Sequence, residues 1–492
     1  MKRILLIFAA FAPCVAGCVD VPKLRQADVT PPAAYEAPQP SPNQAAPVTL
    51  DRWWSLYGDT QLETLVELAL TNAPDAKDAL SKLVQADAIR AGNADQLYIP
   101  QSTLSGTATR THTDILSSTG GIGGFPGFTV GGDTTSLNGT FSATWELDLF
   151  GRRGAASRTI NADFYTAGFT YEATRTSLAA NVAQSLFQVR GLYLQLQDST
   201  ETARIDKDLL RIVQTKVDRG LSAGADLDQA QANSESADAQ AESLKAQLAA
   251  AQRALLVLVG KGFDPLQSLS PSTPIGTPPP VPAEVPGDLL RRRPDVRQAE
   301  WKIVSAAGTL KVDQLALLPT LKINPGVTLA KSTGPFGSSS AAWSVGSSLT
   351  APVLDRPRLI AQIHAQRAVA EQAIIAYEKA VQTAYGDAET AFTYLDSDTR
   401  RVALLAGAEK HADTAYERAR IGYARGYNDL QTALTAETTW RNIRTQLSSA
   451  QSTQMQRSVQ VFKALGGGWS PEAPAAGTPF AGRAARGAEG GR

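Results

Sequence analysis

Two halves of the sequence resemble each other, and this repeat limits the fold more than any other feature. Residues 73–106 correspond to residues 293–326: the first stretch is APDAKDALSKLVQADAIRAGNADQLYIPQSTLSG and the second is RPDVRQAEWKIVSAAGTLKVDQLALLPTLKINPG. Pro100 of the first half aligns with Pro319 of the second after a shift of one residue. Because a duplication means that one structural unit is used twice, we expect a protomer with an internal two-fold repeat.

Four stretches of the chain alternate apolar with polar residues. In the clearest of them, residues 137–149, the apolar residues Leu, Phe, Ala and Trp alternate with Asn, Thr, Ser, Glu and Asp. Alternation with a period of two is typical of a strand that has one apolar and one polar face. We therefore expect strands at about 101–112, 136–149, 320–331 and 342–354.

The lengths of these strands suit a membrane, although half-buried strands of a soluble sandwich would alternate in the same way. A tilted membrane-spanning strand needs roughly 9–11 residues. After residue 17 no apolar run approaches the ~20 residues that a spanning helix needs, so any passage through a membrane would use strands. The smallest membrane barrels have about eight strands. If these four strands span a membrane, several chains must contribute to one barrel.

The rest of each half predicts two long helices. Apolar residues recur every seven positions from Val182 to Val217 and from Ile374 to Val402, and neither stretch contains proline. Sustained heptads indicate helices that pack side by side, and about 65 residues would form a helix about 100 Å long. A coiled-coil rod would explain the heptads alone, but not the strands of the same repeat. We expect long helices at 154–218 and 357–425, and return helices at 226–259 and 428–465.

Each long helix is followed by a turn that contains glycine. The first turn, at 218–232, is DRGLSAGADLDQAQA, and the second, at 422–436, is GYARGYNDLQTALTA. Glycine ends the long helix, while Asp226 in the first turn and Asn428 or Asp429 in the second can cap the return helix. Each half therefore consists of two strands, a long helix, a turn and a return helix, with the turns far from the strands.

Proline-rich and low-complexity segments divide the chain. Residues 18–50 carry many prolines and are expected to form an extended leader. The first repeat follows at 51–260, a proline-rich linker at 261–290 and the second repeat at 291–469. The composition of residues 470–492 predicts a disordered tail.

Residues 1–17 have the layout of a secretory signal peptide: a basic start, an apolar run and small residues at its end. The run closes on residues 15–18, Val-Ala-Gly-Cys, which resemble the lipobox of bacterial lipoproteins. That resemblance implies cleavage before Cys18, a diacylglycerol on its sulfur, a palmitate and anchoring in membrane lipid. Val19 in place of an aspartate favours the outer membrane. The alternative is an ordinary signal peptide with an incidental cysteine.

Composition excludes several classes of function. Lys plus Arg and Asp plus Glu number 47 each, so no basic field favours nucleic acid. The only cysteines are Cys14 and Cys18, which rules out a disulfide framework, and the three histidines are too far apart for a zinc site. The chain has no G-x-S-x-G, H-E-x-x-H or phosphate-loop motif. We therefore expect neither an enzyme nor a cofactor or metal.

Several motifs together resemble the outer-membrane factor family of tripartite efflux systems, in particular its lipoprotein branch related to the NodT nodulation protein. These motifs are the lipobox, WELDLFGR at 145–152, the paired glycine turns and KALGGGW at 463–469, and the similarity covers about residues 18–469. The resemblance implies an α+β membrane protein that forms a homotrimer. Four strands per chain would form a trimeric 12-stranded β-barrel in the outer membrane, continued by a long periplasmic α-helical barrel.

In function, the resemblance implies a passive exit duct for drugs or other small molecules. An inner-membrane pump of the RND type would supply the energy, and a periplasmic adaptor (membrane fusion protein) would dock at the helical tips. In such systems the pump and the adaptor largely choose the cargo. Two alternatives stay open: a type I secretion-type outer-membrane duct for proteins, and a lipid-anchored coiled-coil structural protein.

The resemblance also places a periplasmic gate at the two glycine turns. Family members often carry acidic residues just after the second turn, where this chain has Thr432 and Thr435. Our hypothesis is that Arg425, Asp429 and neighbouring polar groups hold the closed tip by hydrogen bonds; the alternative is that Asp429 is only a helix cap. The candidate tip residues are Arg219, Gly220, Gly224, Asp226, Arg425, Gly426, Asp429, Thr432 and Thr435.

Overall fold

A computed structural model describes residues 24–38, 50–114, 132–269, 275–281, 286–334 and 337–470. The predicted signal peptide, Cys18 and nearly all of the predicted tail lie outside these residues. The chain divides into two compact units. The first contains residues 86–164 and 301–375, and the second contains residues 27–85, 165–300 and 376 onwards.

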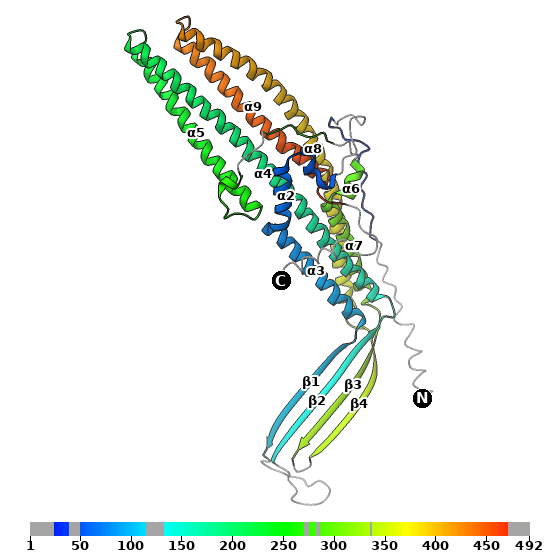
Figure 1. Ribbon diagram of the computed structural model, residues 1–492. Coiled ribbons are helices and arrows are strands. Elements are labelled where there is room, and N and C mark those ends of the chain that lie inside the picture. The colour runs from blue at the N-terminus through cyan, green and yellow to red at the C-terminus, as the bar shows by residue number, and fades with distance from the viewer. Residues whose placement is uncertain are drawn as a thin grey trace, which may run out of the picture. The chain divides into compact units, whose positions relative to one another are not determined.

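The first unit contains one antiparallel sheet, visible as the four arrows in Figure 1, in which the strands follow the order β1-β2-β3-β4. The register places Leu104, Phe141, Val327 and Trp343 in one row across all four strands. The central strands pair on both sides, whereas β1 and β4 each pair on one side only within this sheet. The strands are β1 (Gln101–Thr113), β2 (Gly132–Leu147), β3 (Thr320–Thr333) and β4 (Ser338–Thr350).

The strands end earlier than the alternation predicts in two places. The second strand was expected to reach residue 149, but the chain leaves the sheet at Asp148. The Asp148 carboxylate accepts hydrogen bonds from the backbone amides of Arg152 (2.7 Å) and Arg153 (3.1 Å) at the start of the next helix. A side chain that satisfies these amides acts as a helix cap. The fourth strand ends at Thr350 instead of residue 354, just before Pro352, which has no amide hydrogen for a sheet.

The apolar row of the sheet is exposed and not buried in a core. Leu104 is 83% exposed and Trp343 is 80% exposed, and Phe141 and Val327 are exposed as well. The adjacent row consists of Thr103, Ser142, Gly326 and Ser344 and belongs to the other face, because successive side chains of a strand alternate. A soluble sandwich would bury its apolar face beneath a second sheet, and the described residues contain only this one.

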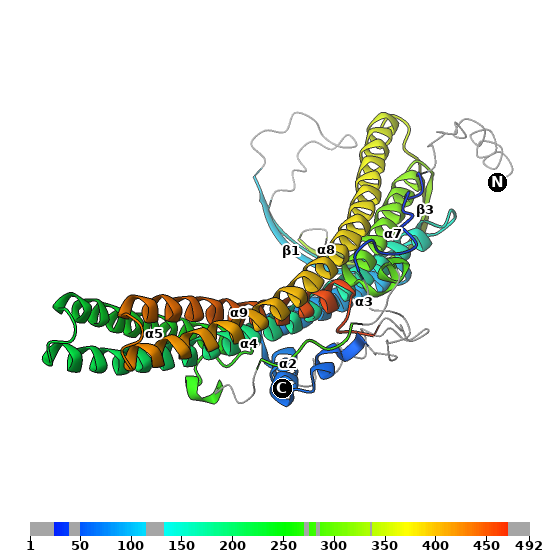
Figure 2. The same cartoon turned by 90° about the horizontal axis from the view of Figure 1, so that it is seen from above.

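The second unit is helical, and several helices belong partly to the first unit. In both views α5 runs back along α4, and α9 runs back along α8 (Figures 1 and 2). No helix in the described ranges is long and apolar enough to cross a membrane. The α-helices are α2 (Thr60–Asn72), α3 (Pro74–Tyr98), α4 (Arg152–Asp218), α5 (Gly224–Leu258), α6 (Leu289–Arg292), α7 (Pro294–Leu315), α8 (Arg356–Ala424) and α9 (Leu430–Ala464), and the 3-10 helices are η2 (Leu50–Tyr57), η4 (Leu266–Leu269) and η5 (Pro286–Asp288).

The predicted repeat corresponds to two similar successions of elements. Both α3 and α7 begin at a proline, which is favoured in the first helical turn because that turn needs no amide donor. A strand follows each of these helices, beginning one residue after Pro100 and Pro319 respectively. Each half then contains a second strand, a long helix and a return helix, as expected for an internal two-fold repeat.

An aromatic cluster forms the centre of the helical core. The Trp53 ring stacks on Phe462 with ring centroids 5.7 Å apart and planes 5° from parallel, and Tyr57 meets Phe462 edge-on. The Tyr57 hydroxyl lies 2.7 Å from Ser458 Oγ, so its polar end has a partner inside the core. Burial raises the pKa of Tyr57 well above its usual range. Large buried rings of this kind contribute much of the stability of a core.

A buried ion pair fixes α2 against α4. Asp59 is the N-cap of α2 and accepts hydrogen bonds from the amides of Gln61 (3.0 Å) and Leu62 (3.1 Å). The buried guanidinium of Arg190 on α4 pairs with the other Asp59 oxygen and donates to Gln61 Oε1 at 2.8 Å. Burial opposes ionisation of Asp59, but Arg190 and these amides outweigh it, so the pKa of this carboxyl is lowered.

The KALGGGW motif has a structural explanation. Gly466 adopts φ +73°, and a β-carbon on it would lie 2.5 Å from the backbone oxygen of Arg292. The amide of Gly468 donates to the Leu50 oxygen at 2.8 Å, and the Trp469 indole donates to the Arg292 oxygen at 2.8 Å. The motif therefore joins the end of α9 to η2 and to α6, which lie far away in the sequence.

We predict that Gly466→Ala destabilises the protein by about 1–3 kcal/mol. Alanine disfavours the left-handed backbone conformation of this position, and its β-carbon would clash with the Arg292 oxygen. The thermal unfolding midpoint of the detergent-solubilised protein would measure this effect. Gly407→Ala is the matched control, since Gly407 lies inside α8 with no atom within 4 Å of its added β-carbon. Helix propensity favours that change by up to ~1 kcal/mol. Equal midpoints for Gly466→Ala and the wild type would contradict the prediction.

Candidate functional site

The two glycine turns at the helical tips have the same backbone structure. In the first, the amide of Gly220 donates to the Val217 oxygen (2.8 Å) and that of Leu221 donates to the Lys216 oxygen (2.8 Å). In the second, the amides of Gly426 and Tyr427 make the equivalent bonds at 3.1 and 2.8 Å. This pair of bonds is the Schellman motif, which needs a residue of positive φ after the helix. Gly220 (φ +73°) and Gly426 (φ +80°) provide it.

The acidic tip residues act at the starts of the return helices. Asp429 is the N-cap of α9 and accepts a hydrogen bond from the amide of Thr432 at 2.7 Å. Hydrogen bonds from the side chain and the amide of Thr432 hold the pKa of the Asp429 carboxyl below its usual range. Asp226 lies in the first turn of α5, which begins at Gly224, and accepts hydrogen bonds from Ser222 Oγ and the Ala223 amide.

The structure does not bring the remaining candidate residues together. Arg219 and Arg425 are exposed, and the side chain of Arg425 forms no hydrogen bond or ion pair within the described ranges of the chain. Thr435 is also exposed and donates its hydroxyl to the Gln431 oxygen of its own helix at 2.8 Å. A role for Arg425 in holding the tip closed would therefore need a partner from another copy, and it stays a prediction.

A contact that the sequence did not indicate links the two tips. Lys216 Nζ, near the end of α4, donates to the backbone oxygen of Tyr423, near the end of α8, at 2.8 Å. The same nitrogen lies 3.6 Å from the centroid of the Tyr423 ring, within the range of a cation–π interaction. A lysine in the last turn of a helix is a known signal for bonding to terminal carbonyls. Nothing in the sequence showed that this carbonyl belongs to a helix 207 residues away.

The apolar tip cluster surrounds this contact. It joins the ends of all four long helices, and aliphatic side chains dominate it. We define it by Leu209, Val213, Ala230, Tyr423, Leu430, Ala433 and Leu434.

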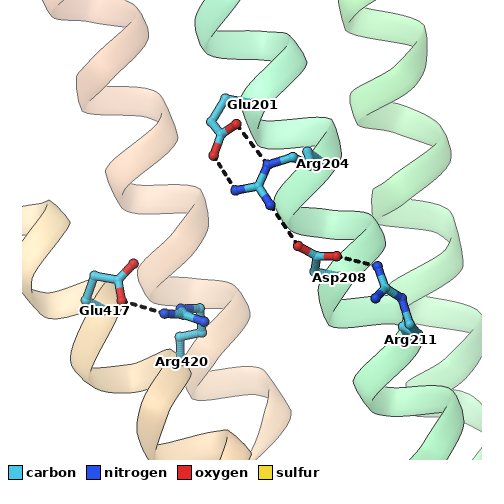
Figure 3. A network of polar contacts seen from close by, with 6 residues as sticks. All are labelled: Glu201, Arg204, Asp208, Arg211, Glu417 and Arg420. Carbon is cyan, nitrogen blue, oxygen red and sulfur yellow. Dashed lines mark hydrogen bonds and ion pairs between the residues drawn. The ribbon is translucent and has the colours of Figure 1, made fainter.

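Charged residues on the outer surface of α4 are paired in a ladder (Figure 3). Arg204 binds both oxygens of Glu201 (2.6 and 3.0 Å) and also contacts Asp208 at 3.0 Å, and Arg211 binds the other oxygen of Asp208. On α8, Arg420 donates one hydrogen bond to Glu417 Oε2 at 2.8 Å. Glu201, Asp208 and Glu417 thus each have a guanidinium partner, although exposed pairs contribute little to stability.

The seam between α4 and α9 contains buried charge. Asp198 of α4 accepts hydrogen bonds from Arg444 and from the Ser448 hydroxyl of α9, both at 2.9 Å. Farther along, Arg441 Nη1 lies 3.2 Å from Asp206 Oδ2 and 3.4 Å from Glu437 Oε1. Sequence analysis missed all of these residues, because heptads mark the apolar positions of a helix and not its buried acids.

In the described ranges no group of three or more His, Cys, Asp or Glu residues could hold a metal ion. The candidate site therefore consists of two turns, a lysine contact that links them and a helix seam that contains buried charges.

The outer membrane efflux protein family has a sequence profile that matches residues 65–261 and 285–467. The chain belongs to this family. The pyoverdine export outer membrane protein OpmQ of Pseudomonas putida is 28% identical over 455 residues, which cover 91% of this chain and 94% of OpmQ. The cation efflux system protein CusC of Escherichia coli is 26% identical over 432 residues, which cover 85% of this chain and 88% of CusC.

Solved structures show the same fold. The crystal structure of the Campylobacter jejuni CmeC outer membrane channel superposes with a TM-score of 0.83 at 21% identity, covering 96% of this chain and 98% of CmeC. The resemblance to outer-membrane efflux proteins and the predicted fold class are thereby confirmed. Assignment to the NodT-related branch stays a prediction. That the chain is not an enzyme also stays a prediction.

We predict that Asp429→Ala frees the first turn of α9, since the Thr432 amide loses its acceptor. Hydrogen–deuterium exchange of residues 430–434 would be faster than in the wild type. Asp228→Ala is the control, because Asp228 is exposed inside α5 and caps no helix. Single-channel conductance separates the two interpretations of Asp429: a value equal to the wild type leaves only the cap, and a changed value supports the gate.

Proposed function

We propose that the protein is the outer-membrane exit duct of a tripartite efflux system and acts as a homotrimer. The observation that supports this most is the exposed apolar row of the sheet, Leu104, Phe141, Val327 and Trp343, in a member of the outer membrane efflux protein family. Large side chains on one face of an open sheet suit lipid, and the small polar residues on the other face suit a wet lumen.

The edges of the sheet support the trimer. In a membrane, every backbone amide and carbonyl needs a partner, so a sheet with open edges is unstable there. Strands β1 and β4 are such edges in a single chain. Pairing β1 of one copy with β4 of the next satisfies both edges, and three copies of four strands give a closed barrel of twelve.

The leader supports anchoring at the N-terminus. Its described part lies along α8: Arg25 pairs with Glu371, and the amides of Glu36 and Ala37 donate to Glu389 at 2.6 and 2.9 Å. In our proposal this segment connects the body to a lipid on Cys18. Several acyl chains would hold Cys18 in the membrane, since each buried methylene contributes about 0.8 kcal/mol.

The partners and the cargo follow from the same proposal. A passive duct needs an energy source, so we assign an inner-membrane pump and a periplasmic adaptor that contacts the helical tips. The related OpmQ is named for pyoverdine export and CusC for cation efflux. Both names favour small cargo over the alternative of a duct for secreted proteins. Their difference indicates that this fold accepts more than one kind of cargo.

We predict that Trp343→Arg prevents insertion into the outer membrane, because an arginine on the lipid face costs ~2–4 kcal/mol near the middle of the bilayer. The amount of native-mass trimer extracted from outer membranes would measure the loss. Ser344→Arg is the matched control, since Ser344 neighbours Trp343 on the opposite face of β4. Equal yields of the two variants would contradict a lipid-facing Trp343, and a purified wild type that is monomeric in mild detergent would overturn the proposal.

The contact between Lys216 and Tyr423, which links the two tips, leads to a second prediction. Lys216→Met keeps a long unbranched side chain but removes the charge that binds the Tyr423 oxygen and ring. We expect a higher single-channel conductance in planar bilayers, because the two turns separate more easily. Lys207→Met serves as control, as Lys207 is exposed on α4 and pairs with Asp238 of α5 and not with a tip residue. A conductance for Lys216→Met that equals both the wild type and the control would remove Lys216 from the gate.

A further inference from the structure

We propose that Asp206 on α4 and Glu437 on α9 form a buried proton-binding site that makes the seam between these helices sensitive to pH. The inference rests on how the helices pack and not on the proposed function. Its failure would therefore leave the efflux duct standing.

The two carboxyl groups share one cation. Asp206 is 2% exposed and Glu437 is 1% exposed, so neither is solvated. A single guanidinium nitrogen, Arg441 Nη1, lies 3.2 Å from Asp206 Oδ2 and 3.4 Å from Glu437 Oε1. With both acids ionised, the site would hold two negative charges against one positive charge, and an uncompensated buried charge is strongly unfavourable.

One carboxylate oxygen of the pair is available to accept a hydrogen bond from the other acid. Asp206 Oδ1 is buried and accepts no hydrogen bond from the described part of the chain. A proton on Glu437 turns that carboxyl into a donor and lets it bond to Asp206. It also reduces the charge of the site to one carboxylate and one guanidinium. Burial, and after it the neighbouring Asp206 carboxyl, raises the pKa of Glu437 to about 8. Because the two acids are coupled, this proton belongs to the pair.

Among the residues that the structure describes, the surrounding elements supply no second cation. Tyr416 of α8 faces Glu437. Burial is the main cause that raises the pKa of Tyr416 and the nearby Glu437 is the second, so Tyr416 remains a neutral phenol. Glu409 of α8 accepts the indole hydrogen of Trp440 at 3.2 Å. The other nearby charges are paired among themselves: Arg420 with Glu417 on α8, Lys207 of α4 with Asp238 of α5, and Arg444 of α9 with Asp198 of α4.

The buried pair has one arginine, Arg441, for two acids, whereas the exposed face of the same helix has two, Arg204 and Arg211, for two acids. On the exposed face of the same helix, Glu201 and Asp208 each contact a guanidinium of the ladder in Figure 3. Asp206 lies between them in the sequence but points into the protein, where Arg441 is its only ion-pair partner among the described residues.

The position of the site connects it to the tips. Leu209 and Leu434 belong to the apolar tip cluster. Asp206 lies three residues before Leu209, and Glu437 lies three residues after Leu434. On its other side the site adjoins the stacked rings of Tyr416 and Trp440, whose centroids are 5.2 Å apart. A change in charge at this point therefore acts on the seam where the tip cluster begins.

The direction of the pH effect follows from proton binding. When the seam is packed, the pair binds a proton that a solvated glutamate would release near its ordinary pKa. The stabilisation is therefore complete below that ordinary value and is lost as the pH rises through about 8. Packing of α4 against α9 is therefore more stable at low pH and less stable at high pH.

Hydrogen–deuterium exchange of the full-length protein in detergent would test this between about pH 6 and about pH 8. The variants are Glu437→Gln, which always donates to Asp206, and the control Glu235→Gln, an exposed acid of α5. Rates are compared at equal pH, so that intrinsic exchange cancels. In wild type and control, we expect the opening constant of residues 198–210 and 434–444 to rise up to about tenfold per pH unit relative to Glu437→Gln.

An infrared spectrum gives an independent readout. At neutral pH the wild type should show the carbonyl band of a protonated carboxyl group, and both Glu437→Gln and Asp206→Asn should lose it. Because two different variants are measured, the test still holds if one of them fails to fold. The same pH dependence of exchange in Glu437→Gln and wild type, or a wild type without the carboxyl band, would overturn the proposal.

Discussion

The open edges of the four-stranded sheet are the constraint on which the rest of the protein depends. Each edge strand has a row of backbone amides and carbonyls with no strand partner in the described part of its own chain. In lipid such groups cannot turn to water, so the sheet is complete only when another copy pairs with it. The exposed row from Leu104 to Trp343 carries the same consequence, because a surface of this kind is stable only against lipid or another apolar surface.

The helical unit is governed by a different balance. Its long helices pack through small apolar clusters and through charges that either lie on the surface or are buried in the seam of α4 and α9. Surface pairs such as Glu201 and Arg204 can exchange partners with water at little cost. Buried groups cannot, so Asp206, Glu437 and Arg441 respond to one proton as a unit. In our proposal, the charge of this seam therefore changes with pH while its apolar contacts stay in place.

Prediction from the sequence succeeded where a local pattern carries the information. Alternation marked the four strands, and heptads with a terminal glycine marked the long helices and their turns. The strand ends were less accurate, because Asp148 bonds to the amides of Arg152 and Arg153 and thereby begins a helix. Lys216 and Tyr423 escaped notice altogether. Their contact depends on how two helices supercoil, and no spacing within either helix encodes that.

The amino-acid sequence by itself determined the repeat, the type of every long element and the family, since each of these follows from periodicity or from contiguous motifs such as WELDLFGR and KALGGGW. Only the tertiary structure decided which residues meet. The glycines of KALGGGW are needed because the backbones of Leu50 and Arg292 approach them. Asp429 caps its own helix while Glu437, eight positions later, is buried against Asp206. The physical reason is that burial and pairing set the energy of a charge, and both depend on neighbours that lie hundreds of residues away in the chain.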